Sequence, residues 1–195
     1  MIKLYCLKIE HFETSFFSEM MSSKYNEESS KRRSSFAWHA LEKILLKEFN
    51  IALNKDMIVF NKHGKPYLKD SHTYFNISHS SDYVVIGLSD SEIGVDIEKL
   101  VSKDRSLHLI NRLNKNFIDE FNSSLDPQEF FTKCWISIES YSKMLGKGLS
   151  FNLIKDHTCL NESIFEIINS KTKEVFYFTA LNKNNDKIDD VYYEI

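Results

Sequence analysis

The sequence predicts a mixed α/β (α+β) fold, and three observations support this prediction. Short segments typical of strands occur near the start of the chain, in residues 74–98 and again after residue 163. Apolar residues at helical spacing occupy residues 36–49 and much of residues 105–145. The pattern changes near residue 101, with helix-like and strand-like segments on both sides. We therefore expect two packed subdomains, residues 1–101 and 102–195, in one integrated unit.

The first half contains strand-like segments around one long helix. Residues 2–9 ("IKLYCLKI") predict a strand, and a polar stretch then leads into a helix over residues 36–49. Residues 61–70 predict a turn, because Gly64 permits unusual backbone angles and Pro66 stops a helix. Residues 74–80, 83–89 and 93–98 predict strands. The last two are joined by "DSE", so we expect them to form a hairpin.

The second half begins with helical patterns. Residues 105–122 are helical in pattern, and a further helix is expected with Asp126 as its cap, Pro127 in its first turn and Gly146 at its end. Three strand-like segments follow at residues 163–169, 174–181 and 190–195.

The composition is that of a folded globule. Of the 195 residues 42% are hydrophobic and 13% aromatic, and the formal net charge is −3, so nothing indicates a nucleic-acid or membrane partner. No run approaches the roughly 18 apolar residues of a membrane span, and no signal peptide opens the chain. Cys6, Cys134 and Cys159 have neither metal-ligand spacing nor a disulfide pattern. We expect a cytoplasmic protein.

Two acids lie at the end of a predicted strand, in "SEIGVDIEKL" (residues 91–100). Because strand side chains alternate, Asp96 and Glu98 share one face, and Val95 and Ile97 share the other. Two ionised carboxylates about 7 Å apart repel each other, and a divalent cation between them removes the repulsion. Mg²⁺ suits such ligands better than zinc. The alternative is a strand edge whose acids are simply solvated.

A second candidate group lies in "WISIESYSKMLGKGLS" (residues 135–150). Trp135, Glu139 and Lys143 stand at i, i+4 and i+8, on one face of a helix. Such a Glu–Lys pair stabilises a helix by only about 0.2–0.5 kcal/mol, and an ordinary surface ion pair is the simplest interpretation. The tryptophan indicates that the face is partly covered, and a partly buried acid requires a partner or a metal.

Further polar residues accompany these groups. Ser78 and His79 follow an apolar strand in "FNISHS", where a lone histidine is more often structural than functional. Short basic clusters are either solvated faces or phosphate contacts, and they comprise Lys31, Arg32, Arg33, Lys62 and Lys65.

Taken together, these segments resemble a known family. "GKPY", "FNISHS", "IGVDIE", "W-x-x-x-E-S-x-x-K" and "GKGLS" occur in the order and near the spacing typical of Sfp-type 4′-phosphopantetheinyl transferases. The resemblance covers about residues 62–150. It implies two similar α/β halves related by a pseudo-twofold axis, with the active site in the cleft between them, and a monomer. It also implies transfer of 4′-phosphopantetheine from coenzyme A to a serine of an acyl or peptidyl carrier protein, releasing adenosine 3′,5′-bisphosphate.

The resemblance also assigns residue roles. Mg²⁺, with Mn²⁺ as an alternative, would be bound by Asp96, Glu98 and Glu139. Glu139 and Lys143 would be catalytic, with Lys143 on the pyrophosphate. The coenzyme would contact Arg33, Lys65, Pro66, Ser78, His79 and Lys143.

One position departs from the family. Many relatives carry a further glutamate about twenty residues before the tryptophan, whereas here that place falls in Lys115–Phe117. Asp119 or Glu120 could replace it after a small shift. Otherwise a metal-bound water or Glu139 must accept the serine proton.

Two other functions stay open on the residues alone. A metal-dependent phosphodiesterase or nuclease would explain the carboxylates, but not "GKP", "SHS" or "GKGLS". A catalytically decayed module that binds coenzyme A or a carrier protein would explain the missing glutamate, but not the intact acids and lysine.

Overall fold

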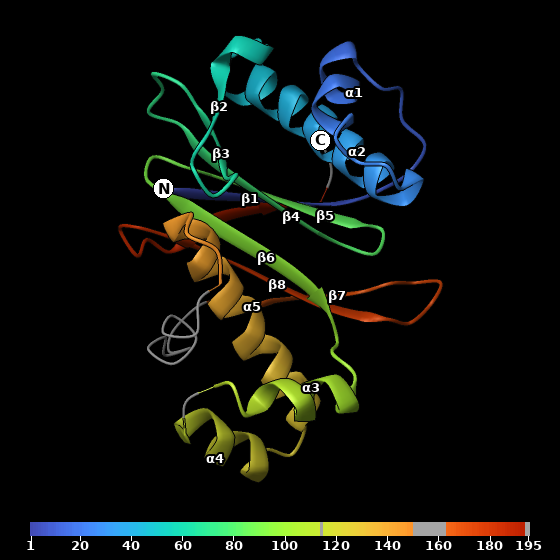
Figure 1. Ribbon diagram of the computed structural model, residues 1–195, viewed down its shortest axis with the longest axis vertical. Helices are drawn as coiled ribbons and strands as arrows, with labels where there is room; N and C mark the ends of the chain where they lie inside the picture. The colour runs from blue at the N-terminus through green and yellow to red at the C-terminus, as the bar shows by residue number, and fades with distance from the viewer. Residues whose placement is uncertain (114, 150–162, 194–195) are drawn as a thin grey trace.

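The computed structural model describes residues 1–113, 115–149 and 163–193. It confirms the mixed α/β class (Figure 1). The elements are, in chain order, β1 (Ile2–Lys8), α1 (Phe16–Ser22), α2 (Glu28–Phe49), a 3-10 turn (Lys55–Met57), β2 (Ile58–Phe60), β3 (Pro66–Leu68), β4 (Tyr74–Ser80), β5 (Tyr83–Ser89), β6 (Ile93–Lys99), α3 (Lys103–Ile110), α4 (Lys115–Ser123), α5 (Pro127–Leu145), β7 (Phe165–Ile168), β8 (Val175–Asn182) and β9 (Ile188–Tyr192).

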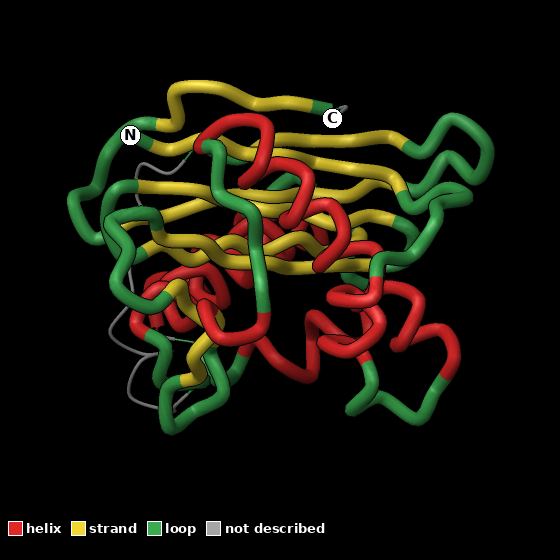
Figure 2. Tube along the Cα trace, turned by 90° about the horizontal axis from the view of Figure 1, so that it is seen from above, coloured by secondary structure: helices red, strands yellow, loops and turns green. Residues whose placement is uncertain are grey.

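The strands form two larger sheets and one hairpin. The four-stranded sheet has the order β4-β5-β1-β9, with β9 parallel to β1, and the three-stranded sheet has the order β6-β8-β7. β2 and β3 form the hairpin whose turn contains Gly64, at a φ of +86°. Figure 2 shows the strands running through the body of the molecule with helices on their outside.

The predicted hairpin between residues 83–89 and 93–98 is wrong. β5 pairs with β1 and β4, whereas β6 pairs with β8 (Val95 opposite Ala180). Every residue of β5 is buried, as expected for a strand covered on both faces. The turn after β5 therefore carries the chain from one sheet to the other, and the two strands pack face to face.

The layers explain why the first strand is apolar on both faces. Ile2, Leu4 and Cys6 lie in a core between the two sheets, together with Val95 and Ile97 of β6. The alternate residues of β1, Tyr5 and Leu7, lie in a second core beneath α1 and α2. α5 packs against β6 on the other side, so the order of layers is helices, sheet, sheet, helix (Figure 1).

The helix predictions are confirmed in different degrees. The long helix of the first half is α2, which begins at Glu28, and α1 was not predicted. Residues 105–122 fall in two helices, α3 and α4. α5 matches its prediction closely: the Asp126 side chain accepts a hydrogen bond from the Glu129 backbone, and Gly146 ends the helix in the left-handed conformation. None of the described helices is both long and apolar enough to cross a membrane.

Candidate active site

Two neighbouring elements carry the predicted acids and lysine. α5 lies so close to β6 that a Cβ atom on Gly94 would stand 1.9 Å from a backbone carbonyl oxygen of the helix. Only a residue without a Cβ atom permits this approach. β6 contributes Asp96 and Glu98, and α5 contributes Glu139 and Lys143. The close packing therefore brings together side chains from two separate segments.

Asp96 is a buried carboxylate with one engaged oxygen. Its Oδ1 accepts hydrogen bonds from the Ser78 hydroxyl group (2.8 Å) and from Nζ of Lys143 (2.5 Å), and the lysine also donates to Ser78 Oγ (2.8 Å). The Asp96 side chain is only 6% exposed. Its other oxygen, Oδ2, is buried and has no hydrogen-bond partner among the described residues. Asp96 is thus held by one oxygen and has acceptor capacity left on the other.

The negative charge of Asp96 contributes to raised pKa values of Glu98 and Glu139. The pKa of Glu139 is raised to about 7, mainly by burial and next by the negative charge of Asp96. The pKa of Glu98 is also raised, by burial and then by Asp96. The guanidinium group of Arg105, on α3, lies 3.5 Å from Oε1 of Glu98 and partly offsets this effect. The three acids therefore form one electrostatic cluster.

The cluster was tested for its fit to a divalent cation. Carboxylate oxygens are the donors that Mg²⁺ prefers, and Oδ2 of Asp96 is a buried acceptor without a partner. Within residues 1–113, 115–149 and 163–193, however, no three His, Cys, Asp or Glu side chains stand close enough to hold a metal ion as they are. Asp96 and Glu98 instead face Lys143 and Arg105. The carboxylate chemistry thus suits the cation, whereas the present side-chain arrangement pairs these acids with basic residues.

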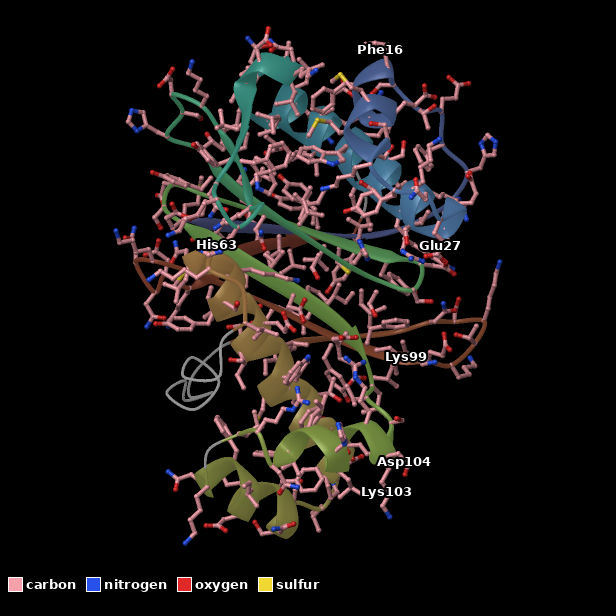
Figure 3. The ribbon with its side chains drawn as sticks, viewed as in Figure 1. Phe16, Glu27, His63, Lys99, Lys103 and Asp104 are labelled. Atoms are coloured by element: carbon pink, nitrogen blue, oxygen red, sulfur yellow. The ribbon has the colours of Figure 1, made fainter. Side chains whose placement is uncertain are left out.

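A cleft of about 340 Å³ opens beside this cluster. It lies between the β2–β3 turn, β4 and the C-terminal part of α5, and its walls include Pro66, Glu139 and Lys143. His63, labelled in Figure 3, lies on the same wall near the end of α5. A second hollow of about 190 Å³ shares Pro66 with this cleft and extends to His79. The two hollows are therefore adjacent, and together they could accommodate an elongated ligand.

Lys65 has a structural position at the edge of the cleft. Its Nζ donates to the backbone carbonyls of Ile93 (2.9 Å) and Met144 (3.0 Å), and it lies 3.2 Å from the Glu92 carboxylate. Burial lowers the pKa of Lys65, and Glu92 counteracts this effect. In this structure Lys65 ties the β2–β3 turn to the start of β6 and the end of α5.

Arg33 and Arg32 are neighbours in the sequence but differ in their relation to His79, which lines the second hollow. His79 is exposed, and its pKa is lowered by desolvation and then by the positive charges of Arg33 and Lys143. Arg33 is half-buried and donates to Ser30 Oγ (3.1 Å). Arg32 is exposed and reaches the carbonyl oxygen of Glu10 (3.4 Å). Arg33, rather than Arg32, therefore contributes to the positive potential around His79.

The structure adds site residues that the sequence patterns did not reveal. Arg105, in the first turn of α3, pairs with Glu98, and it lies in no recognisable sequence motif. Asn76 lines both hollows, and its side-chain oxygen accepts a hydrogen bond from the Val95 backbone (2.9 Å). An asparagine in an otherwise apolar strand was the available signal, because a buried amide needs such a partner.

The position of the missing glutamate falls at the start of α4. Lys115, at the start of that helix, is exposed, as are Asp119 and Glu120 further along it. Ser150, the last residue of the "GKGLS" segment, lies outside the described residues. Among the described residues lining the 340 Å³ cleft, Glu139 is the one carboxylate.

Comparisons with known proteins agree with the resemblance. The 4′-phosphopantetheinyl transferase ffp of Bacillus subtilis is 40% identical over 107 residues, which cover 52% of this chain and 47% of that protein. The corresponding values are 36% over 107 residues for 4′-phosphopantetheinyl transferase Sfp of Bacillus subtilis strain 168, with coverages of 52% and 47%. For 4′-phosphopantetheinyl transferase gsp of Aneurinibacillus migulanus they are 30% over 111 residues, with coverages of 56% and 46%.

The chain spans about half the length of these curated relatives. No protein-family model matches it. These three relatives, at 30–40% identity, are nevertheless all 4′-phosphopantetheinyl transferases. The chain is similar to Sfp-type 4′-phosphopantetheinyl transferases over about half of its length.

Proposed function

We propose that this protein transfers 4′-phosphopantetheine from coenzyme A to a serine of an acyl or peptidyl carrier protein. The observation that carries the proposal is the convergence of Asp96, Glu98, Glu139 and Lys143, from β6 and α5, beside a cleft in a chain related to such transferases. The serine oxygen forms a bond to the phosphorus of the phosphopantetheine group. The bond from that phosphorus to adenosine 3′,5′-bisphosphate breaks.

In this proposal Asp96, Glu98 and Glu139 hold Mg²⁺, or Mn²⁺ in its place. The bound ion supplies charge neutralisation at the pyrophosphate and fixes its orientation. Burial of Asp96 supports its role as a ligand, because a buried carboxylate with an unpartnered oxygen gains most from a cation. Carboxylates from both β6 and α5 would make the ion a link between strand and helix.

The basic residues of the cleft are proposed to bind the rest of the coenzyme. Lys143 lies on the cleft wall and is placed to contact the pyrophosphate, where it would stabilise charge on the departing bisphosphate. Arg33 and His79 would contact the nucleotide's 3′-phosphate in the adjoining hollow, with Pro66 beside the adenine. Lys65 would contribute positive charge at the cleft edge, and Ser78 would act through its hydrogen bonds to Asp96 and Lys143.

Glu139 is proposed to accept the serine proton. It is the carboxylate on the cleft wall among the described residues, whereas Asp119 and Glu120 are exposed on α4. A base must stand within hydrogen-bond reach of the attacking hydroxyl group, directly or through one water. Glu139 lines the cleft that a carrier serine would enter, and this supports the proposed role.

The family relation also leads us to propose two similar subdomains, residues 1–101 and 102–195, related by a pseudo-twofold axis. The sheets would interlock them, because β6 of the first range pairs with β8 of the second, and β9 pairs with β1. We further propose that the protein acts as a monomer in the cytoplasm.

The test is incubation of apo carrier proteins with the protein, coenzyme A and Mg²⁺, followed by mass spectrometry. The expected product is a carrier heavier by one phosphopantetheine group. Asp96→Ala should abolish labelling while circular dichroism shows a retained fold. Wild-type labelling by this variant in the presence of Mg²⁺ would refute the metal assignment.

A binding module without turnover is the second candidate, and the lack of a glutamate in Lys115–Phe117 favours it. It predicts that coenzyme A binds in calorimetry but that no carrier in a broad panel gains mass. Labelling of any carrier excludes it.

A further inference from the structure

Lys143 is bonded to the carboxylate that the proposed function gives to the metal. Its Nζ lies 2.5 Å from Oδ1 of Asp96 and 2.8 Å from Ser78 Oγ. Asp96 is the acid that the proposal gives to the metal, and the lysine is the cation that it gives to the pyrophosphate. A metal ion at the unpartnered Oδ2 of Asp96 would lie beside the ammonium group on Oδ1, so the two cations compete for one carboxylate.

The Lys143–Asp96 ion pair is largely buried and held by hydrogen bonds. The Asp96 side chain is 6% exposed and that of Lys143 is 29% exposed, so solvent screens the pair only in part. A buried carboxylate without a counter-ion is strongly unfavourable, and the Lys143 ammonium group is the cation in contact with it. Ser78 bonds to both partners and fixes their geometry.

The surroundings allow the lysine to move. Lys143 lies in the last turn of α5, three residues before Gly146, and its flexible side chain also forms part of the wall of the 340 Å³ cleft. The described acids do not form a metal-holding group as they stand. A change of partner at Asp96 would free the carboxylate and turn the ammonium group towards the cleft.

We propose that Lys143 is the resident cation of Asp96 in the ligand-free protein, and that a divalent metal ion and this lysine exchange at the carboxylate. The proposal rests on the proposed function for the identity of the incoming ion. Binding of metal alone is weakened, because the metal ion competes with the lysine for the same carboxylate. A pyrophosphate group then gives the released ammonium group a new partner, which couples the binding of metal to that of the coenzyme.

The first test is calorimetric titration of Mg²⁺ alone, without nucleotide, into the wild type, Lys143→Gln and Lys147→Gln. Lys147 is exposed and four residues further along, so its variant controls for the loss of one positive charge. Lys143→Gln should bind Mg²⁺ about tenfold more tightly than the wild type, which is about 1.4 kcal/mol. Lys147→Gln should stay within about twofold. Equal or weaker binding by Lys143→Gln overturns the proposal.

A second measurement uses the wild-type protein and needs no substitution at Lys143 or Asp96. In ¹⁵N-lysine spectra of the wild type, the Lys143 ammonium hydrogens should be protected from exchange in metal-free buffer, because they are bonded to Asp96 and Ser78. Addition of Mg²⁺ alone should remove the protection. Unchanged protection at saturating Mg²⁺ overturns the exchange.

These readouts are separate from the transferase assay. Exchange without labelling of any carrier would count against the proposed function and leave the exchange intact. Carrier labelling with unchanged Mg²⁺ affinity in Lys143→Gln would support the proposed function and overturn the exchange.

Discussion

At the scale of single residues, Glu139 makes the metal-free protein sensitive to pH. Its pKa is raised to about 7 from an ordinary value of 4.5, so the folded state holds a proton that the unfolded state releases. Its contribution to stability is therefore fully present below about pH 4.5 and is lost as the pH rises to about 7. Above that range Glu139 is ionised near Asp96, and the positive charges of Lys143 and Arg105 offset the repulsion only in part.

We expect Glu139→Gln to flatten this part of the pH profile. In a chelator, urea unfolding of the wild type should show stability falling between about pH 4.5 and pH 7, and the variant should lose much of that slope. Glu120→Gln, an exposed acid on α4, serves as the control and should follow the wild type. Identical slopes for Glu139→Gln and the wild type would show that Glu139 titrates normally.

The role of Arg105 can be tested by measuring the pKa of its neighbour Glu98. Its guanidinium group lowers the pKa of Glu98 against the opposite effects of burial and Asp96. Arg105→Gln should therefore raise the pKa of Glu98, as measured by the carboxyl carbon signal in NMR titration. Its effect on stability should be below about 1 kcal/mol, because the arginine side chain is 52% exposed.

Arg112→Gln is the matched control for this experiment. Arg112 is exposed and follows the end of α3, and its replacement removes the same charge from nearby. It should leave the pKa of Glu98 unchanged. A shift of equal size in both variants would indicate a general loss of positive charge rather than the contact with Glu98.

At the scale of elements, the packing of α5 on β6 depends on Gly94. A Cβ atom there would lie 1.9 Å from the carbonyl oxygen of Ser140 and 2.3 Å from the backbone nitrogen of Met144. Backbone cannot yield as a flexible side chain does, so Gly94→Ala should force the helix away from the strand. We expect a loss of about 3 kcal/mol in urea unfolding, together with loss of Mg²⁺ binding.

Gly64→Ala separates this clash from the general cost of replacing glycine. Nothing lies within 4 Å of the added Cβ, but φ is +86°, so a strain of about 1 kcal/mol is expected. Similar losses for the two variants would contradict the assigned role of Gly94.

The elements also show which features can be read from a sequence. α5 was predicted with its cap and its end, because Asp126, Pro127 and Gly146 act within one or two turns. The hairpin of β5 and β6 was wrong, because the partner of β6 is β8, about eighty residues later. Strand alternation correctly predicted that Val95 and Ile97 share one face of β6, and this face lies in the core between the sheets. The contacts of Arg105 and Lys65 depend on tertiary packing and had no local signal.

At the scale of the whole molecule, the site connects parts that are distant in the sequence. The cleft is formed by the β2–β3 turn, β4 and α5, and the acids come from β6 and α5. Asn61, in the β2–β3 turn, donates a hydrogen bond from its side chain to the carbonyl oxygen of Gly146 (2.8 Å), and Lys65 adds its bond to Met144. A ligand in the cleft would therefore contact side chains from elements that are distant in the sequence.

We expect Mg²⁺ and coenzyme A together to raise the melting temperature by more than the sum of their separate effects. The stabilisation by each ligand grows with the logarithm of its concentration relative to its dissociation constant, and about 2.7 kcal/mol is gained at a hundredfold excess. If metal and coenzyme share the site formed by β6 and α5, each increases the affinity for the other, and the gains exceed additivity. Differential scanning fluorimetry over a grid of both concentrations measures this. Asp96→Asn should remove the Mg²⁺ effect and the excess while keeping part of the coenzyme effect, because Arg33 and His79 are unchanged in this variant. Strictly additive shifts in the wild type would mean that the two ligands bind at independent places.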